Sequence, residues 1–261
     1  MIPQADFMWI DPDLFFSLNK FWILIAILLF PIQLFITAPY GRHISRTWGY
    51  LIDNRLGWVI MEIVSPTVFL FFLLTGVSEL TTPVAVFAVL WCLHYLNRSL
   101  IFPWRTRTSG KKIPLTIVGS AIFFNCMNGF FNGYYLGNFS QQYDQSWFFE
   151  WNFIFGLALF LGGAFINIQS DEILINLRKP GETGYKIPKG GLFHRLSCPN
   201  HFGEIVEWTG FALMCWNISA LSFAIWTAAN LIPRALSHHR WYKSHFTSYP
   251  AERKAVLPFL I

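Results

Sequence analysis

Long apolar runs separated by short polar segments dominate the chain, and this pattern predicts a bundle of helices that cross a membrane. A helix needs about 17–25 apolar residues to cross a hydrocarbon core of ~30 Å. Five runs meet this length: 20–39, 56–76, 82–103, 113–135 and 148–168. A sixth run, 202–235, is too long for one span, and dividing it near Trp216 and Asn217 gives seven predicted transmembrane helices.

The charged residues between the runs predict how the helices are oriented. Membrane proteins concentrate Lys and Arg in their cytoplasmic loops. Acidic residues occur before the first run and in the second and fourth loops, for example Asp6, Glu79 and Asp144. Nearly all basic residues fall in four other segments: 40–55, 104–112, 169–201 and 234–261. This alternation predicts an N-terminus outside, a C-terminus in the cytoplasm and an odd number of spans.

Composition supports the same class. Of the 261 residues, 54% are hydrophobic and only 13% are charged, whereas soluble domains carry about 25% charged residues. We therefore predict an all-α polytopic membrane protein with a single domain over residues 1–261. The net charge of +5 reflects the basic loops, because no nucleic-acid-binding module is recognisable. The four cysteines match no disulfide framework, and the acidic N-terminus lacks a signal-peptide pattern.

Glu62, Tyr95 and Arg98 lie inside predicted spans, where polar groups are costly and mark functional sites by default. Glu62 lies about six residues into the second span, or ~9 Å from its cytoplasmic start. Tyr95 lies ~12 Å from the cytoplasmic end of the third span, and Arg98 is one turn nearer that end on the same face. An acid and a phenol at similar depth can donate hydrogen bonds to a carbonyl oxygen as negative charge develops on it.

The longest polar segment, Asn167 to Trp208, joins the fifth and sixth spans and contains basic residues and the turns PGETG and PKGG. These features are typical of a loop that binds a polyanion. We interpret the cytoplasmic half of the bundle as a site for an apolar ligand and a charged cofactor. The alternative is a purely structural polar network between helix ends. The polar residues in this layer, besides those inside the spans, are Asn167, Asp171, Asn200, Glu204, Arg234 and His238.

Other candidate sites are weaker. His194, Cys198 and His201 have loose metal-ligand spacing, but a lone C-x-x-H beside a basic loop is usually structural, so we predict no metal site. Neither a GxGxxG nor a Walker motif occurs in the sequence. A nucleotide would therefore not be held by a Rossmann domain.

Several longer motifs stand along the chain: INIQSD, LRKPGETGYKIPKGGLF, PNHFGEIVEW, RALSHHRWY and YPAERKAVLPFLI in the second half, with CLHYLNR and PYGRH in the first. Together they resemble the steroid 5α-reductase (3-oxo-5α-steroid 4-dehydrogenase) family. The resemblance implies an oxidoreductase that uses NADPH to reduce the C4=C5 double bond of a 3-oxo-Δ4-steroid, with hydride going to C5. It also implies that Glu62 and Tyr95 hold the 3-keto oxygen, in agreement with the acid and phenol found above.

The resemblance further implies a division of labour along the chain. Residues 1–135 would supply the helices on the substrate side, and residues 148–261 the helices and loops that bind NADPH. Arginine in the loop after the third span, Arg107 or its neighbour Arg105, would suit a 2′-phosphate. The implied cofactor-binding residues are Arg42, Arg98, Arg107, Asn167, Asp171, Arg178, Tyr185, Asn200, Glu204, Arg234, His238 and Tyr242.

One position departs from the family pattern, and because of it the identity of the substrate is not determined by the resemblance. Met61 precedes Glu62, where the mammalian steroid enzymes of the family have Gln, so a polar side chain beside the carbonyl would be lost. A reductase of enoyl-CoA or polyprenal type keeps the same chemistry. An isoprenylcysteine-type carboxyl methyltransferase is a second alternative, but methyl transfer needs no such pair of proton donors as Glu62 and Tyr95. A sterol sensor or a transporter is the non-catalytic alternative, although a transporter would show a repeat.

The implied partners are an apolar enone that enters from the lipid and the bilayer itself, with no nucleic acid and no oligomer implied. The membrane would be either a bacterial inner membrane or the endoplasmic reticulum.

Overall fold

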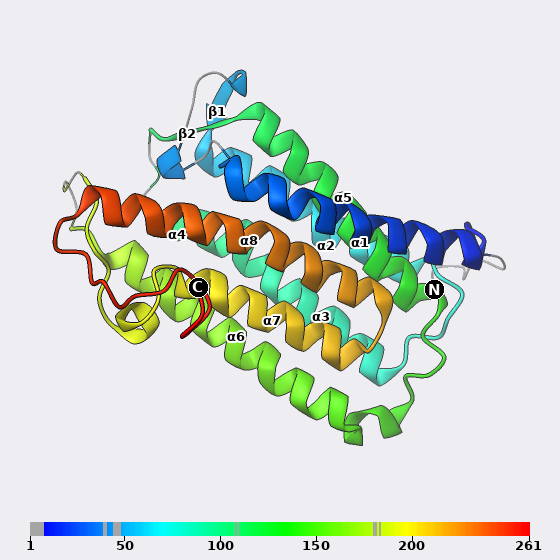
Figure 1. Ribbon diagram of the computed structural model, residues 1–261. Coiled ribbons are helices and arrows are strands. Elements are labelled where there is room, and N and C mark those ends of the chain that lie inside the picture. Colours follow the sequence, from blue (N-terminus) through cyan, green and yellow to red (C-terminus); the bar gives the residue numbers. More distant parts are fainter. Residues whose placement is uncertain are drawn as a thin grey trace. The chain divides into compact units, whose positions relative to one another are not determined.

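The computed structural model describes residues 8–38, 41–43, 48–106, 108, 110–179, 182 and 184–261. Within this part of the chain, seven long helices contain most of the residues (Figure 1). They are α1 (Pro12–Phe35), α2 (Asn54–Leu74), α3 (Thr82–Leu96), α5 (Leu115–Asn138), α6 (Trp151–Asn176), α7 (Pro199–Cys215) and α8 (Ile218–His245). The shorter elements are 3-10 turns at Gly41–His43, Gln145–Phe149 and Gly191–His194, a π-helical turn at Asn97–Ile101, α4 (Phe102–Arg105), β1 (Leu51–Asp53) and β2 (Lys112–Pro114).

The ends of these helices follow from local sequence. Asp53 is the N-cap of α2, and its Oδ1 accepts a hydrogen bond from the Leu56 amide at 3.0 Å. Proline stands in the first turn of α3 and of α7, where no amide hydrogen is needed. α7 ends at Trp216, whose backbone is left-handed with φ 49° and ψ 44°, and α8 starts at Ile218. The predicted break near Trp216 and Asn217 is therefore confirmed.

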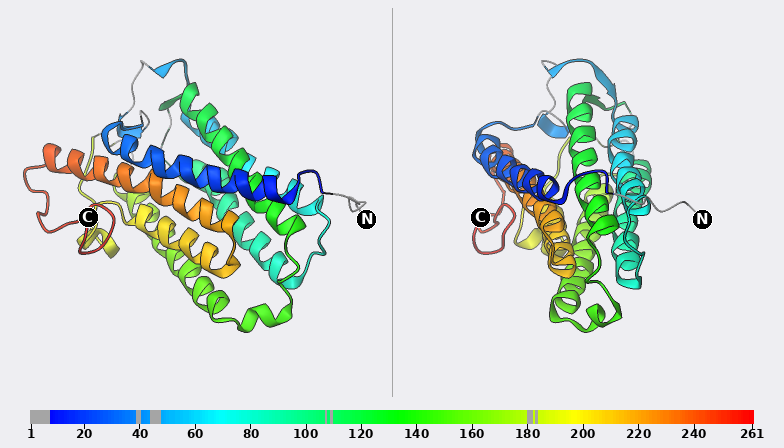
Figure 2. Two further views of the ribbon diagram at one scale, coloured as in Figure 1. Left: turned by 45° about the vertical axis from the view of Figure 1, so that its right-hand side comes forward. Right: turned by 90° about the vertical axis from the view of Figure 1, so that its right-hand side faces the viewer.

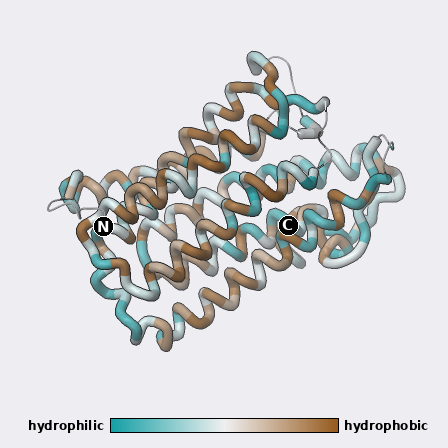
Figure 3. The backbone as a smooth tube through the Cα atoms, turned by 180° about the vertical axis from the view of Figure 1, so that it is seen from behind, coloured by the Kyte–Doolittle hydropathy of each residue, from teal (hydrophilic) through white to brown (hydrophobic). Residues whose placement is uncertain are grey.

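Five helical segments of the described chain are long and apolar enough to cross a membrane, and they correspond to the first five predicted runs. Figure 3 shows hydrophobic residues along the long helices and hydrophilic residues in the segments at their ends. α7, with 17 residues, and α8 are helical as expected but are not among the five. The five segments are Pro12–Phe35, Asn54–Leu74, Thr82–Arg105, Leu115–Asn138 and Trp151–Asn176.

Two predicted helix boundaries are wrong. The first helix begins at Pro12 rather than at residue 20, because the polar residue that interrupts the apolar pattern is accommodated inside the protein. Asn19 is fully buried, and its Nδ2 donates a hydrogen bond to the Ser219 Oγ at 2.6 Å. The fifth run was expected to end at residue 168, but α6 continues to Asn176. Asn167 and Asp171 consequently lie within a helix rather than at its end.

The chain divides into two compact units. The first comprises Met1–Phe21, Ala38–Ile154 and Asn217–Ala220, and the second comprises Trp22–Thr37, Phe155–Trp216 and Leu221–Ile261. The single domain over residues 1–261, with a substrate side and a cofactor side, stays a prediction.

In the first unit, glycines of α5 bring its backbone against that of α2. A Cβ atom at Gly129, Gly133 or Gly137 would lie 2.8, 2.3 or 2.5 Å from a carbonyl oxygen of α2, so no larger residue fits there. β1 and β2 immediately precede the two helices and pair antiparallel, with Ile52 opposite Ile113. This pairing fixes where α2 and α5 begin relative to each other.

In the second unit, α6 and α7 lie side by side through a similar glycine contact (Figure 1). A Cβ atom at Gly163 would lie 2.5 Å from the Gly203 oxygen, and one at Gly203 would lie 2.7 Å from the Gly163 oxygen. Two turns farther along, a Cβ atom at Gly210 would lie 2.6 Å from the oxygen of Gly156. The two backbones therefore touch over much of the length of α7.

The same unit contains the second part of α1, α8 and the C-terminal segment. Figure 2 shows the second part of α1 alongside α8. The Trp22 and Trp226 rings lie 4.4 Å apart, and the Trp226 indole donates to the Trp22 carbonyl at 3.0 Å, which joins the two helices. The C-terminal segment returns to the start of α7, where the Lys254 amide donates to the Arg195 carbonyl at 2.9 Å. The Cys198 amide likewise donates to the Ala255 carbonyl at 3.0 Å.

Candidate functional site

In the first unit, two aromatic contacts join α2 to α3 on either side of Glu62. Near the start of α2, the Arg98 guanidinium lies 5.1 Å from the centre of the Trp58 ring. Farther along, the Phe69 ring stacks on the Trp91 ring at 4.8 Å with an interplanar angle of 11°. Glu62 follows Trp58 by one turn on the same face of α2 and so lies between these contacts.

Tyr95 occupies the matching place on α3, between Trp91 and Arg98. Its side chain is only 3% exposed, and its ring lies 5.4 Å from the Trp91 ring and 5.1 Å from the His94 ring. Because α2 and α3 run antiparallel between the two contacts, Glu62 and Tyr95 stand at the same level on facing helices. The fold of one unit therefore sets the acid and the phenol that the sequence singles out at one level on neighbouring helices.

A π-helical turn, Asn97–Ile101, continues α3 immediately after Tyr95 and carries Arg98. Such turns add a residue to the helical turn and are frequent at functional sites. The Ser99 hydroxyl donates to the Tyr95 carbonyl at 2.6 Å and satisfies a backbone oxygen at this irregular turn. Arg98 lies 5.1 Å from the Phe102 ring as well as from the Trp58 ring, so its cation is held between two aromatic rings.

The side chain of Met61 packs toward β2 and α5, and Trp58 of the aromatic face packs against the same cluster. Met61 is 5% exposed and packs with Ile113 and Val118, which belong to β2 and α5. Glu62 is one residue farther along the helix and is rotated by about 100° from Met61. Met61 therefore adjoins Glu62 on the side of α2 that packs against β2 and α5.

In the second unit, four of the predicted cofactor residues form one hydrogen-bonded cluster on α6 and α7. The Asn167 amide donates to the Asn200 carbonyl at 3.0 Å and to a Glu204 carboxylate oxygen at 3.4 Å. The Asn200 amide in turn donates to an Asp171 carboxylate oxygen at 3.1 Å. Asn167 and Asp171 are buried, with 3% and 7% of their surfaces exposed.

The glycine contact explains why this cluster forms. A Cβ atom at Gly203 would lie 2.5 Å from the backbone nitrogen of Asn167, so α7 passes directly against the backbone of α6 at this point. Only such a close approach lets short Asn and Asp side chains bridge two helices. The cluster is therefore a product of backbone packing as well as of its polar side chains.

The predicted residues of α8 follow one helical face, since Arg234, His238 and Tyr242 are four residues apart. Arg234 is 7% exposed and Tyr242 is 3% exposed. The His238 ring lies 5.8 Å from the ring of His201, which is on α7 beside Asn200. The Tyr242 ring stacks on the Tyr249 ring at 5.2 Å with an angle of 9°. This face of α8 thus borders the polar start of α7 and the C-terminal segment.

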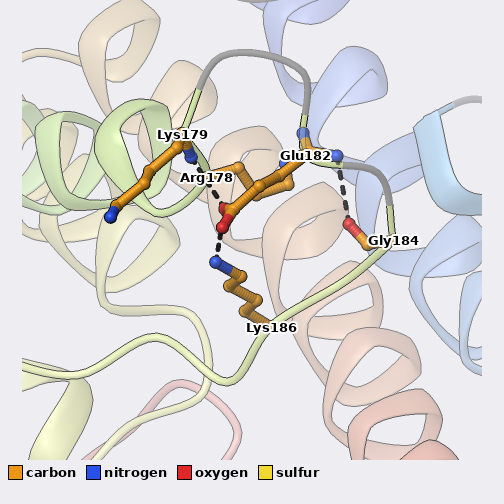
Figure 4. A network of polar contacts seen from close by, with 5 residues as sticks. All are labelled: Arg178, Lys179, Glu182, Gly184 and Lys186. Atoms are coloured by element: carbon orange, nitrogen blue, oxygen red, sulfur yellow. Dashed lines mark hydrogen bonds and ion pairs between the residues drawn. The ribbon is translucent and has the colours of Figure 1, made fainter.

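The basic loop after α6 is organised around Glu182 (Figure 4). A Glu182 carboxylate oxygen accepts a hydrogen bond from the Lys179 amide at 2.8 Å and also from the Lys186 ammonium. These bonds, that of Lys186 first, hold the pKa of the Glu182 carboxyl below its usual value. The Arg178 guanidinium donates to the Gly184 carbonyl at 3.2 Å. Tyr185 follows this turn, and its ring lies 4.7 Å from that of Trp241 on α8.

Arg253 is a residue of interest that the sequence analysis did not single out. It is 4% exposed, donates from Nη2 to the Pro188 carbonyl at 3.0 Å and lies 5.3 Å from the centre of the Tyr249 ring. Its Nε and Nη1 groups have no hydrogen-bond partner among the described residues. A buried guanidinium with two unpaired N–H groups has the chemistry to hold a phosphate oxygen. The signal available in the sequence is its position within the motif YPAERKAVLPFLI, but no local pattern there shows that Arg253 is buried.

Two predicted cofactor residues fall outside what the structure describes. Arg107 is not among the described residues, and for Arg42 only the backbone, in the turn Gly41–His43, is described. In the described part of the chain, no group of three His, Cys, Asp or Glu residues is arranged to hold a metal ion.

Comparison with known proteins gives a consistent result. The model of the 3-oxo-5-alpha-steroid 4-dehydrogenase family matches residues 111–261. The chain is 39% identical over 256 residues to steroid 5-alpha-reductase DET2 of Solanum lycopersicum, covering 96% of this chain and 98% of that protein. It is 38% identical over 232 residues to the protein of the same name from Gossypium hirsutum, covering 87% and 89% of the two chains. It is 40% identical over 225 residues to human 3-oxo-5-alpha-steroid 4-dehydrogenase 1, covering 85% and 86%.

Proposed function

The chain belongs to the 3-oxo-5-alpha-steroid 4-dehydrogenase family of oxidoreductases, and from this membership we propose that it reduces the C4=C5 double bond of 3-oxo-Δ4-steroids. The observation that carries the proposal is the placement of Glu62 and Tyr95 at one level on α2 and α3, between the Trp58–Arg98 and Phe69–Trp91 contacts. An apolar, aromatic site with one acid and one phenol suits an enone whose carbonyl oxygen accepts a hydrogen bond from each of them.

Glu62 and Tyr95 would act on the carbonyl oxygen of the substrate. Reduction at C5 moves negative charge onto the 3-keto oxygen, and donors aimed at that oxygen stabilise the charge as it develops. A carboxyl group in apolar surroundings tends to keep its proton and can therefore donate a hydrogen bond. The Tyr95 hydroxyl would supply the second bond, and a proton would be added at C4 after the charge has formed.

NADPH is the proposed cofactor, and when bound it supplies the hydride that reduces C5. The residues of the second unit fit its charges. The buried Arg253 has two unpaired N–H groups, and Arg234 is a second buried cation. Arg178 and Lys186 on the loop after α6 would bind phosphate oxygens, while the Asn167, Asp171, Asn200 and Glu204 cluster offers polar contacts to the rest of the nucleotide. Tyr185, His238 and Tyr242 of the same unit would complete this site. Arg42, Arg98 and Arg107, which the family resemblance also implies, stay predicted cofactor-binding residues.

The proposed topology gives the apolar substrate and the charged cofactor separate routes to the protein. We propose seven spans, with α7 and α8 added to the five apolar segments, an external N-terminus and a cytoplasmic C-terminus. The substrate would enter from the lipid and the cofactor from the cytoplasm. This arrangement holds in either a bacterial inner membrane or the endoplasmic reticulum.

The experiment that tests the function is incubation of the detergent-purified protein with NADPH and progesterone or testosterone, followed by mass spectrometry of the steroid. We expect a product heavier by two hydrogens, formed only with NADPH and lost in Glu62→Gln. If the protein binds NADPH and reduces an enoyl-CoA or a polyprenal but neither steroid, its substrate belongs to that class and not to the 3-oxo-Δ4-steroids. Binding of S-adenosylmethionine in place of NADPH would overturn the proposal.

A further inference from the structure

Four asparagines are buried along α5, and one of them makes a contact of a different kind. The Asn132 and Asn138 amides each donate to the carbonyl four residues earlier in their own helix, at 3.0 and 2.9 Å. The Asn125 amide instead crosses to α2 and donates to the Met61 carbonyl at 2.6 Å. Asn125 is 5% exposed, so this bond is made away from solvent.

The acceptor of this bond is the peptide group that directly precedes Glu62. The Met61 carbonyl carbon is bonded to the Glu62 nitrogen, so a hydrogen bond to this oxygen holds the peptide plane from which the Glu62 side chain starts. The Met61 side chain is fixed from the same direction, because it packs with Ile113 and Val118. Backbone and side chain of the residue before Glu62 are thus both held by β2 and α5.

Glycine packing keeps the donor in place. One turn after Asn125, a Cβ atom at Gly129 would lie 2.8 Å from the Ser65 oxygen and 3.1 Å from the Phe69 nitrogen. The α5 backbone therefore touches α2 directly, just beyond the turn that carries Glu62. The contact leaves little freedom for α2 to rotate or slide, and it delivers the short Asn125 side chain to a backbone oxygen that α2 already uses within its own helix.

We propose that Asn125 is a positioning residue: its amide, bonded to the Met61 carbonyl, sets the rotation of the α2 turn that carries Glu62. Glu62 then faces α3, at the level of Tyr95, rather than the α5 side of the helix. This inference rests on the proposed function, in which Glu62 donates to the substrate carbonyl. A group that must meet an oxygen within hydrogen-bonding distance is sensitive to small rotations, and a 1 Å misplacement costs on the order of a hundredfold in rate.

Asn125→Leu tests the proposal, because leucine has a similar size but no donor. We expect kcat for steroid reduction to fall by about tenfold to a hundredfold, with little change in the steroid KM and in NADPH affinity. Asn132→Leu is the matched control: it removes an equally buried amide from the same helix, but one that bonds within α5. It should keep kcat near the wild-type value even if the protein melts at a lower temperature.

Two further variants separate positioning from folding. Asn125→Gln keeps an amide donor and should recover part of the lost kcat, whereas Asn125→Ser keeps a polar group too short to reach Met61 and should behave like Asn125→Leu. If Asn125→Leu does not fold, the comparison of Ser with Gln decides the matter. Wild-type kcat in Asn125→Ser, or equal losses in the Leu variants at positions 125 and 132, would overturn this inference alone. A wild-type protein that binds NADPH yet reduces no enone would overturn the proposed function and the inference with it.

Discussion

At the scale of single residues, the proposed chemistry depends on two donors that meet one oxygen. Removing one donor of this kind typically costs about a hundredfold to a thousandfold in kcat. We therefore expect Tyr95→Phe to lower kcat by roughly this factor while leaving NADPH affinity unchanged, as measured by steady-state kinetics and cofactor titration. Turnover at the wild-type rate in Tyr95→Phe would show that the phenol is not a donor to the substrate.

The chain offers a matched control for this variant. Tyr134 is also a buried tyrosine of the first unit, with 2% of its surface exposed, but its hydroxyl bonds the backbone of Ile10 at 2.9 and 3.1 Å. Tyr134→Phe should lose about 1 kcal/mol of stability and keep its kcat. A parallel fall of kcat in both variants would point to general disruption of the unit rather than to chemistry at Tyr95.

Individual residues differ in how well the sequence predicts their role. Glu62 and Tyr95 stand out because they are polar inside apolar runs, and the structure brings them to one level. Asn125 is also polar inside an apolar run and is buried, but nothing in the sequence shows that its partner is the Met61 carbonyl. Arg253 lies in a tail rich in charge and aromatic rings, and its burial depends on a loop more than fifty residues away in sequence, at Pro188. Long-range contacts of this kind have no local signal.

At the scale of elements, the polar cluster of α6 and α7 depends on the absence of a side chain at Gly163. A Cβ atom there would lie 2.3 Å from the Glu207 nitrogen and 2.5 Å from the Gly203 oxygen. Gly163→Ala must push the two helices apart, which costs about 1–3 kcal/mol, and it should weaken NADPH binding because Asn167 and Asn200 separate. Thermal melting and cofactor titration measure the two effects.

The neighbouring glycine provides the control. A Cβ atom at Gly162 would meet nothing within 4 Å, so Gly162→Ala should keep NADPH affinity and gain up to about 1 kcal/mol from better helix propensity. Equal behaviour of the alanine variants at 162 and 163 would mean that close packing of α6 and α7 does not matter for the cofactor.

The loop between α6 and α7 should respond to pH through Glu182. Because the pKa of this carboxyl in the folded loop lies below its ordinary value of 4.5, its bonds to Lys186 and Lys179 contribute fully above that value and are lost as the pH falls through the lowered pKa. A spin label at Lys189→Cys should therefore become more mobile only in acid. In Glu182→Gln we expect the label to be mobile at every pH, and an unchanged pH response in that variant would contradict the role of Glu182.

At the scale of the whole molecule, hydrophobic pattern predicts helices well and their packing poorly. The five apolar segments and the break at Trp216 follow from length and composition alone. In α5, Asn125, Asn128 and Asn132 share one face and are buried, but α2 has few polar residues, so no such stripe indicates which of its faces is inward. Phe69 is fully buried and Phe71, two residues later, is 49% exposed, although the residues are identical. Which of the two is buried depends on how α2 packs against α3 and α5, and the sequence of α2 does not contain that information.

The number of spans is the prediction on which the proposed access of substrate and cofactor depends. With seven spans, a residue of the tail lies on the side opposite to the segment between α5 and α6; with six, the two lie on the same side. Ser248 and Gln145 are both exposed and suit this comparison. In sealed vesicles whose cytoplasmic face is inward, we expect a membrane-impermeant thiol reagent to label Gln145→Cys from the outside and Ser248→Cys only after permeabilisation. The native cysteines are buried or half-buried, and the wild-type chain gives their background labelling. Labelling of both variants from the outside would show that one of the spans proposed after Gln145 does not cross the membrane. It would also place the basic tail, with Arg253, on the side opposite to the cytoplasmic cofactor.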